Sequence, residues 1–271
     1  MSEILGLGFM HNALLAGLLV SLVCGMLSVF IVLRRMAFVG AGISHSAFGG
    51  VALGFLLHVD PFWTGLIFAI LVAFLIEWVQ SRGKIEEDTA IGIFFAAAMA
   101  LGVVFLHLSR TYNVDVFGVL FGNILSVGRT QLHQVAGVAA VVLFFIWFFF
   151  KELVFISFDE EMAWVCGAPV KALRYLFLAA LALVIIASIY LVGIVLVSAL
   201  LVIPAAVARN LTTQIRSMIL VSTGTAIGST LGGLGFSYLI DLPSGATIVI
   251  LLAGLFLLTT AWSRYRLTGT G

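Results

Sequence analysis

Charged residues, proline and cysteine are all scarce in this chain of 271 residues. Asp, Glu, Lys and Arg make up 9% of the sequence, 63% is hydrophobic, and the mean hydropathy is +1.26. Soluble domains are about 45–50% apolar, so this composition excludes a soluble globular protein. The 4 Pro and 28 Gly fit transmembrane helices that approach one another closely. The sequence therefore predicts an all-α, polytopic helical membrane protein.

Two further absences narrow the class. The net charge of +1 gives no sign of a nucleic-acid partner. The only two cysteines, Cys24 and Cys166, lie far apart in sequence and in predicted depth, which argues against a disulfide framework. We expect one transmembrane domain over residues 1–271.

Long apolar runs are what the sequence does contain. A helix needs roughly 20 apolar residues to cross a bilayer. The runs predict about nine spans, with eight as the alternative: 11–33, 38–57, 62–80, 90–108, 132–150, 171–190, 193–208, 217–239 and 244–262. Residues 114–128 are apolar but short and interrupted by Gly, which favours a re-entrant or interfacial segment. Pro204 should kink or break the seventh span.

The distribution of Lys and Arg indicates the orientation. With the N-terminus outside and the C-terminus inside, only Arg110 and Arg129 of the 13 basic residues lie outside. The inner loops then hold the other basic residues: Arg34, Arg35, Arg82, Lys84, Lys151, Lys171, Arg174, Arg209, Arg216, Arg264 and Arg266.

A short polar-bounded segment, about residues 157–167, lies between two spans on the predicted cytoplasmic side. Ser157 and Glu160 have the spacing of a capping box, and Gly167 is a typical helix stop. Acidic residues gather at its first turn, while an apolar face recurs at i, i+4, i+7. These two sets are Asp159, Glu160 and Glu161, and Phe158, Met162 and Val165. The pattern favours a helix on the membrane surface that a partner can push.

Small residues recur every four positions in two spans, which predicts close helix packing. The first stripe is Gly42, Ser46, Gly50 and Gly54, and the second is Gly224, Gly228 and Gly232.

One longer motif resembles a known family. The motif is Arg35-Met36-Ala37-Phe38-Val39-Gly40-Ala41-Gly42-Ile43-Ser44-His45-Ser46, followed by Gly49-Gly50-Val51-Ala52-Leu53-Gly54. It resembles the permease subunits of ABC-type zinc, manganese and iron importers, the ZnuB-like proteins. Further agreement lies in residues 87–93, 114–125, 192–209 and 241–249, so the resemblance covers nearly the whole chain in order.

The resemblance implies a homodimer of permeases, two cytoplasmic ATPase subunits and a metal-binding protein that delivers the ion from outside. It also implies that residues 157–167 are the coupling helix. The chain contains no Gly-x-x-x-x-Gly-Lys-Ser/Thr phosphate loop, so it is not expected to be an enzyme, and ATP must be bound by a partner. No permanently bound cofactor is expected, only a transported zinc, manganese or iron ion.

One position departs from the family motif. The family usually has an Asp where this chain has Ala41, with that Asp and the following His as candidate metal ligands. The loss weakens coordination of a hard ion at that point, so either another group substitutes or the ion is held only transiently.

Several polar residues are candidates for the metal path, each with a plainer alternative. His45, beside Ser44, lies deep in an apolar helix, where it is either a ligand or a hydrogen-bonded packing residue. Asp115 can supply a carboxylate or cap a short helix, and His107 lies near the outer end of the fourth span. His58 and Asp60 can receive metal at the outer mouth or form a solvated turn.

Two acidic residues near the inner ends of the spans are given structural roles. Asp88 with Thr89 is expected to N-cap the fourth span. Glu77 is expected to snorkel toward the membrane surface.

Two other functions stay open at this point. A secondary metal carrier would need no ATPase, but the chain lacks a membrane-centre cluster of acids. Permeases for cobalamin or iron-siderophore complexes are usually longer. The transported ion is left undecided, because one visible His suits zinc, manganese and iron almost equally.

Overall fold

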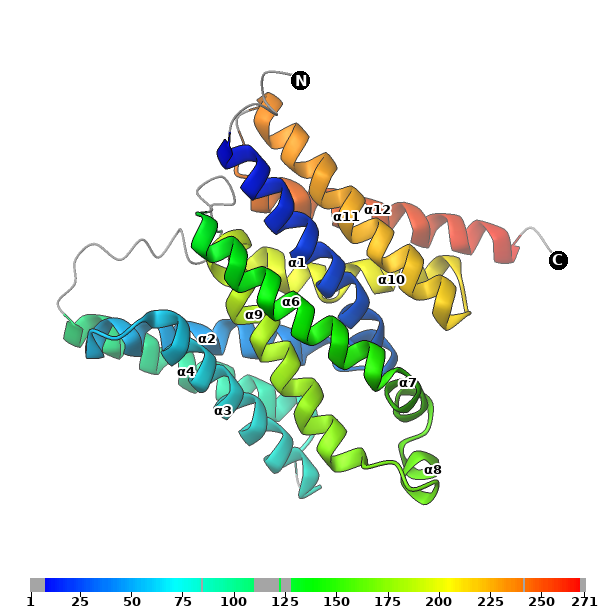
Figure 1. The fold of residues 1–271 in the computed structure, drawn as a ribbon. Helices are drawn as coiled ribbons and strands as arrows, with labels where there is room; N and C mark the ends of the chain where they lie inside the picture. Colours follow the sequence, from blue (N-terminus) through cyan, green and yellow to red (C-terminus); the bar gives the residue numbers. More distant parts are fainter. Residues whose placement is uncertain (1–7, 84, 110–121, 123–127, 241, 269–271) are drawn as a thin grey trace.

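The computed structural model describes residues 8–83, 85–109, 122, 128–240 and 242–268. Within these residues every regular element is a helix (Figure 1). The helices are α1 (Gly8–Leu33), α2 (Ala37–Leu57), α3 (Pro61–Ser81), α4 (Glu87–Ser109), α6 (Arg129–Phe148), α7 (Phe150–Phe158), α8 (Glu160–Val165), α9 (Val170–Leu200), α10 (Ile203–Leu211), α11 (Ile215–Ile240) and α12 (Ser244–Thr268).

Nine helical segments of the described chain are long and apolar enough to cross a membrane. They coincide with the nine predicted runs, so the all-α polytopic class is confirmed. Helices satisfy every backbone hydrogen bond within one segment, which is why apolar runs in a bilayer fold this way. Most of the predicted segment 114–128 lies outside the described residues.

The seventh span differs from a single kinked helix. α9 continues past residue 190 and is interrupted at Gly193, whose φ of 81° lies in the left-handed region. The chain breaks again at Val202, and Pro204 lies in the first turn of α10, where its missing N–H costs no hydrogen bond. The helix break that Pro204 predicts is therefore present, two residues before the proline, at Val202.

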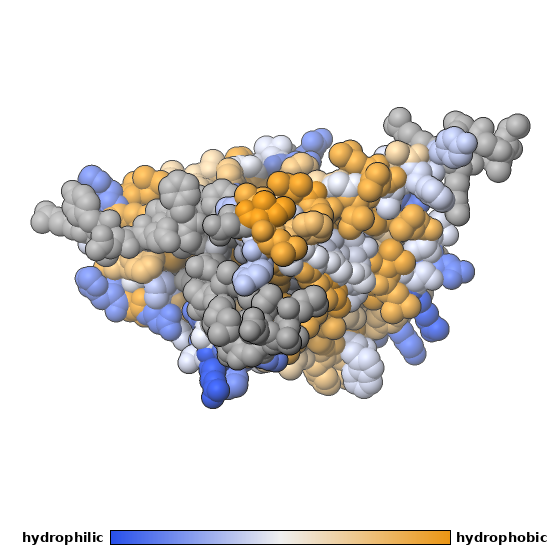
Figure 2. All heavy atoms as spheres, turned by 90° about the horizontal axis from the view of Figure 1, so that it is seen from above, coloured by the Kyte–Doolittle hydropathy of each residue, from blue (hydrophilic) through white to orange (hydrophobic). Residues whose placement is uncertain are grey.

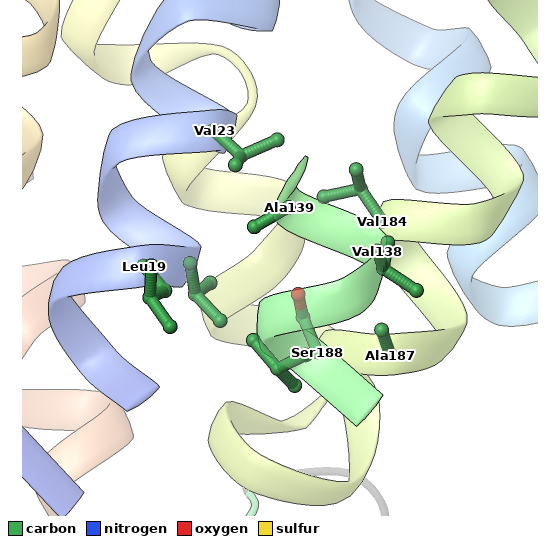
Figure 3. Close-up of a pocket in the computed structure, with 9 residues that line it drawn as sticks. Leu19, Val23, Val138, Ala139, Val184, Ala187 and Ser188 are labelled. Carbon is green, nitrogen blue, oxygen red and sulfur yellow. The ribbon is translucent and has the colours of Figure 1, made fainter. Parts of the chain in front are cut away.

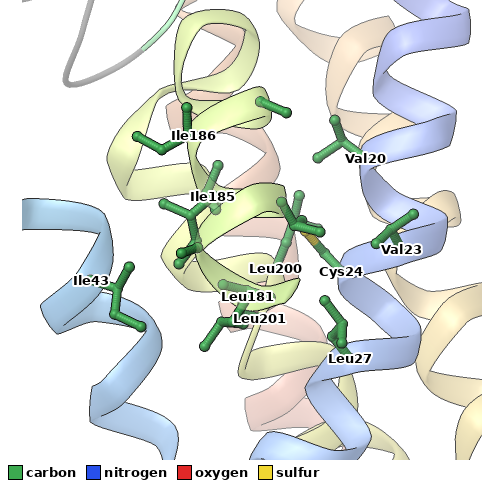
Figure 4. Close-up of a cluster of buried hydrophobic side chains, with 14 of the residues drawn as sticks. Val20, Val23, Cys24, Leu27, Ile43, Leu181, Ile185, Ile186, Leu200 and Leu201 are labelled. Carbon is green, nitrogen blue, oxygen red and sulfur yellow. The ribbon is translucent and has the colours of Figure 1, made fainter. Parts of the chain in front are cut away.

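The core lies where α1 and α2 meet α9 (Figure 4). Leu27 and Ile43 point toward Leu181 and Leu201, and all four side chains are fully buried or nearly so. α1 also lies beside α11, where hydroxyls pair across the interface: Ser21 with Thr230 at 2.6 Å and Ser28 with Ser222 at 2.8 Å. Such polar pairs hold helices together where lipid removes the hydrophobic drive.

The two stripes of small residues have different surroundings. A Cβ on Gly42 would collide with Ile91 of α4, and one on Gly50 would collide with Phe68 of α3. The first stripe therefore lets α2 approach both neighbours closely. Within the described residues a Cβ on Gly224 or Gly228 of α11 would meet nothing within 4 Å, and one on Gly232 would make only an ordinary contact, 3.8 Å from Leu251 of α12, so the close approach predicted along the second stripe is not found there.

Hydrophobic side chains cover much of the visible surface, and hydrophilic ones gather toward its edges (Figure 2). Large apolar residues are exposed along α4, α6 and α12, as expected for helices that face lipid or another apolar surface. This distribution places the membrane around the bundle and the polar loops at its ends.

Candidate functional site

A pocket of about 430 Å³ opens between α2 and α4 beside His45. It is lined by Phe38, Ala41, Gly42, His45, Asp88, Ile91, Gly92 and Phe95. The missing side chain of Gly92 leaves open space in its wall, whereas Ile91 occupies the space beside Gly42 and brings the two helices close together. The motif around His45 therefore folds into a concave surface rather than a filled helix interface.

The His45 ring is held in one orientation. Its Nδ1 lies 2.9 Å from the carbonyl oxygen of Ala41, and its edge packs on Phe95 with the ring centroids 5.1 Å apart. A carbonyl can only accept, so Nδ1 is the donor and, in the neutral ring, Nε2 keeps its lone pair. This is the arrangement of a metal-ligating His, in which the second nitrogen is fixed by a backbone carbonyl.

Asp88 lines the same pocket and is exposed. The sequence placed it at the cap of the fourth span, but α4 begins earlier, at Glu87, and the amides of Thr89 and Ala90 bond to the Glu86 carbonyl. The capping role is therefore wrong, because Asp88 already lies inside the first turn. The described part of one chain contains no group of three or more His, Cys, Asp or Glu residues that could hold a metal.

Two other predicted path residues, Ser44 and His107, do not line this pocket. Ser44 is fully buried and donates to the Gly40 carbonyl at 2.7 Å, on a face of α2 that does not line the pocket. His107 is exposed near the C-terminal end of α4, and Asp115 lies outside the described residues.

His58 and Asp60 form an exposed turn between α2 and α3. His58 is the left-handed C-cap of α2, with φ 54°, and Asp60 accepts from the Phe62 amide at 2.9 Å as the N-cap of α3. Asp60 also borders a second cavity, of about 260 Å³, with Thr130 and Gln131 of α6. The exposed cap formed by Asp60 fits the alternative that these residues form a solvated turn. That His58 and Asp60 receive metal at the outer mouth stays a prediction.

The predicted coupling segment is a shorter helix than expected. α8 spans only Glu160–Val165, and its N-cap is Asp159, whose carboxylate accepts from the Met162 amide at 2.9 Å. Ser157 belongs to α7, where its hydroxyl donates to the Leu153 carbonyl at 2.6 Å, so the Ser157–Glu160 capping box is wrong. The stop at Gly167 is confirmed by its φ of 87°.

An apolar face of this segment points away from the protein. Phe158 is 66% exposed, Met162 52% and Val165 71%. Trp164, which the sequence reading did not single out, is 70% exposed beside them. The opposite face is anchored by Ala163, which is fully buried against Ile156, Val170 and Leu173.

Buried charges lie behind this helix and were not predicted to meet. Arg174 of α9 forms ion pairs with Glu77 of α3 and Glu160 of α8, each at 2.9 Å. Glu77 is only 2% exposed, so the expectation that it snorkels is wrong. Arg34 lies close by: burial lowers the pKa of its guanidinium and the charge of Arg174 lowers it further, while Glu160, Glu77 and Glu87 raise it. A signal for this cluster was present in the sequence: Glu77 and Arg174 carry opposite charges within apolar spans, and both lie near the predicted cytoplasmic side.

A further pocket, between α1, α6 and α9, is apolar (Figure 3). Val23, Ala139 and Val184 line it, and Ser188 points its hydroxyl toward it. Its volume is about 10 Å³, which is room for about one water molecule. It is therefore a packing defect and no ligand site.

Comparison with known proteins finds relatives that match nearly the whole chain. The model of the ABC 3 transport family matches residues 7–263. The manganese transport system membrane protein MntC of Halalkalibacterium halodurans is 37% identical, with 96% of this chain and 89% of that protein covered. The probable iron transport system membrane protein of Haemophilus influenzae is 35% identical, with 96% of this chain and 95% of that protein covered.

A solved structure has the same fold. PsaBC from Streptococcus pneumoniae, in complex with Fab, superposes with a TM-score of 0.85 at 36% identity, with 95% of this chain and 93% of that chain covered. The family match, the identities and the shared fold all cover nearly the full length. This chain is a member of the ABC 3 transport family.

Proposed function

We propose that this chain is the permease of an ATP-driven importer that carries a divalent metal ion, manganese or iron, into the cell. The pocket at His45 is the observation that carries this proposal, because an imidazole nitrogen and the Asp88 carboxylate face one cavity in a membrane helix pair. Nitrogen and oxygen ligands suit manganese and ferrous iron, and the named relatives transport these metals. Zinc binds the same ligand types.

A second copy of the chain completes the site in this proposal. The pocket opens beside apolar residues that stay exposed on one chain, including Phe38, Ile93 and Val104. Two-fold symmetry would bring two His45 rings and two Asp88 carboxylates to one axis. Four ligands from two chains would coordinate an ion that the described part of a single chain cannot hold.

The apolar face of α8 is the proposed docking surface for the ATPase subunits. Its exposed Phe158, Met162 and Val165 need a partner that removes them from water. Glu161, which is exposed at the acidic first turn, favours a basic surface around that contact, whereas Glu160 is paired with Arg174 of the same chain. A metal-binding protein would deliver the ion at the opposite end of the bundle, near His58 and Asp60.

The decisive experiment measures uptake ion by ion. The complex, purified with its ATPase and placed in proteoliposomes, should take up manganese or iron only with ATP. His45→Ala should reduce uptake by at least about tenfold, because loss of a ligand costs about 10-fold or more in metal affinity or activity. Thermal unfolding and ATPase co-purification should stay unchanged.

His133→Ala is the matched control, since His133 is an exposed histidine on α6 away from the pocket. It should transport at the wild-type rate. Full uptake by His45→Ala in a folded, ATPase-bound complex would show that the ion does not pass this residue.

A further inference from the structure

The charged cluster behind α8 connects three helices through one side chain. The Arg174 Nε lies 2.9 Å from Glu77 Oε1, and its Nη1 donates to Glu160 Oε1 at 2.9 Å. The guanidinium is 21% exposed, Glu77 3% and Glu160 42% by side chain. The planar fork of Arg can hold two carboxylates in a set geometry, which the point charge of Lys cannot.

Arg174 of α9 thus links α8 to α3 through a pair of ionic contacts. Elsewhere a groove of about 1060 Å³ lies between the two helices, lined by Ser81, Glu161, Trp164 and Tyr175 among others. α8 is otherwise anchored by Ala163 against α7 and α9. A displacement of α8 therefore reaches α3 through the Arg174 ion pairs, in addition to the packing of α9 against α3.

The connection continues from α3 to the His45 pocket. One turn after Glu77, Gln80 Nε2 donates to Glu87 Oε2 at 2.6 Å, which joins the end of α3 to the start of α4. Asp88, the next residue, lines the pocket. Both links are partly or wholly buried, so water and salt screen them less than surface pairs.

We propose that Arg174 is a positioning residue that transmits movement of α8 to α3 and, through Gln80 and Glu87, to the pocket wall on α4. Without it, movement of α8 would reach α3 only through the packing of α9 against α3, and the α4 wall beside His45 would follow less closely. The inference rests on the proposed function, because it assigns the route by which an ATPase docked on α8 acts on the ion site.

Glu160→Gln is the least disruptive test of this route. Glu160 is the more exposed partner of Arg174, and after its removal Arg174 still pairs with Glu77. Metal transported per ATP hydrolysed should fall by about threefold or more, in the range that changes at coupling residues produce. ATPase co-purification and the ATP hydrolysis rate should stay within the wild-type range. Glu86→Gln, the same change at an exposed acid beside α4, should leave the ratio unchanged.

The double variant Glu77→Gln with Arg174→Gln removes both members of the buried pair, so neither of these two charges is left facing an uncharged partner. It should reproduce the lowered ratio, and Arg174→Lys should restore part of it when Glu77 and Glu160 are intact. Lys171→Gln, one turn earlier on α9 in the same groove, is its control.

The outcomes separate this inference from the function it rests on. A wild-type ratio in both Glu160→Gln and the double variant would overturn the role of Arg174 while leaving metal import intact. A wild-type complex that hydrolyses ATP but moves no metal would overturn the proposed function itself.

Discussion

At the scale of single residues, His45 and Ala41 form one unit. The Ala41 carbonyl holds the ring by Nδ1, and the Ala41 side chain lines the same pocket. The position where the family motif has a carboxylate therefore borders the same pocket as the His45 ring. A small side chain there leaves the pocket with fewer permanent ligands, which suits an ion that must leave again.

Ala41→Asp should tighten retention of metal. The added carboxylate faces the pocket that His45 and Asp88 already line, so it adds an oxygen ligand and a negative charge. We expect about tenfold more metal to stay bound after dialysis, measured by elemental analysis, and a slower turnover. Ala41→Asn has nearly the same shape without the charge and should stay close to wild type. Equal retention by both variants would contradict a direct ligand effect.

At the scale of elements, the start of α8 shows how similar residues divide their roles. Asp159, Glu160 and Glu161 all lie at the first turn, where the helix dipole favours acids. Asp159 caps the helix and Glu160 bonds to Arg174. Ser157, which has the sequence spacing of a cap, is absorbed into the preceding helix.

Asp159→Ala should loosen α8, because losing an N-cap costs about 1 kcal/mol and this helix has only six residues. Less ATPase should co-purify with the variant, and hydrogen exchange should quicken in α8. Ser157→Ala should leave both readings at wild type, since its hydroxyl bonds back to Leu153 in α7. A larger loss of co-purified ATPase with Ser157→Ala than with Asp159→Ala would show that Ser157, and not Asp159, caps α8.

At the scale of the whole molecule, one end of the bundle gathers the buried charges. Arg34, Glu77, Glu87 and Arg174 come from the ends of four different helices and act on one another. This end also holds α8, so the proposed ATPase side and the charged cluster coincide. The distribution of Lys and Arg independently predicts that the same loops are cytoplasmic.

Single cysteines in a chain with Cys166→Ser test this orientation. Thr213→Cys and Gly83→Cys should react with a membrane-impermeant maleimide only after the membrane is opened. Val59→Cys and Leu242→Cys, which replace exposed residues at the other end, should react in intact cells. The reversed pattern would show that the N-terminus is inside.

Local sequence determined the elements. A run of about 20 apolar residues must form a helix in lipid, because no water is there to satisfy its backbone, and so all nine spans were predictable. Gly167 stops α8 as predicted, since glycine has no Cβ to resist a positive φ. The motif around His45 likewise indicated the helix that carries the pocket.

Tertiary structure decided which surfaces meet. Glu77 and Arg174 are almost a hundred residues apart, and only the packing of α3 beside α9 brings them together. The two glycine stripes read alike in sequence, yet the first packs tightly against two helices, whereas in the second only Gly232 has a neighbour in contact range, Leu251 of α12. Asp88 lies inside the first turn of α4 and lines the pocket, because α4 begins at Glu87, two residues before the start that a cap at Asp88 predicts. Helix insertion depends on each segment's own hydrophobicity, whereas these contacts depend on the partner each face finds.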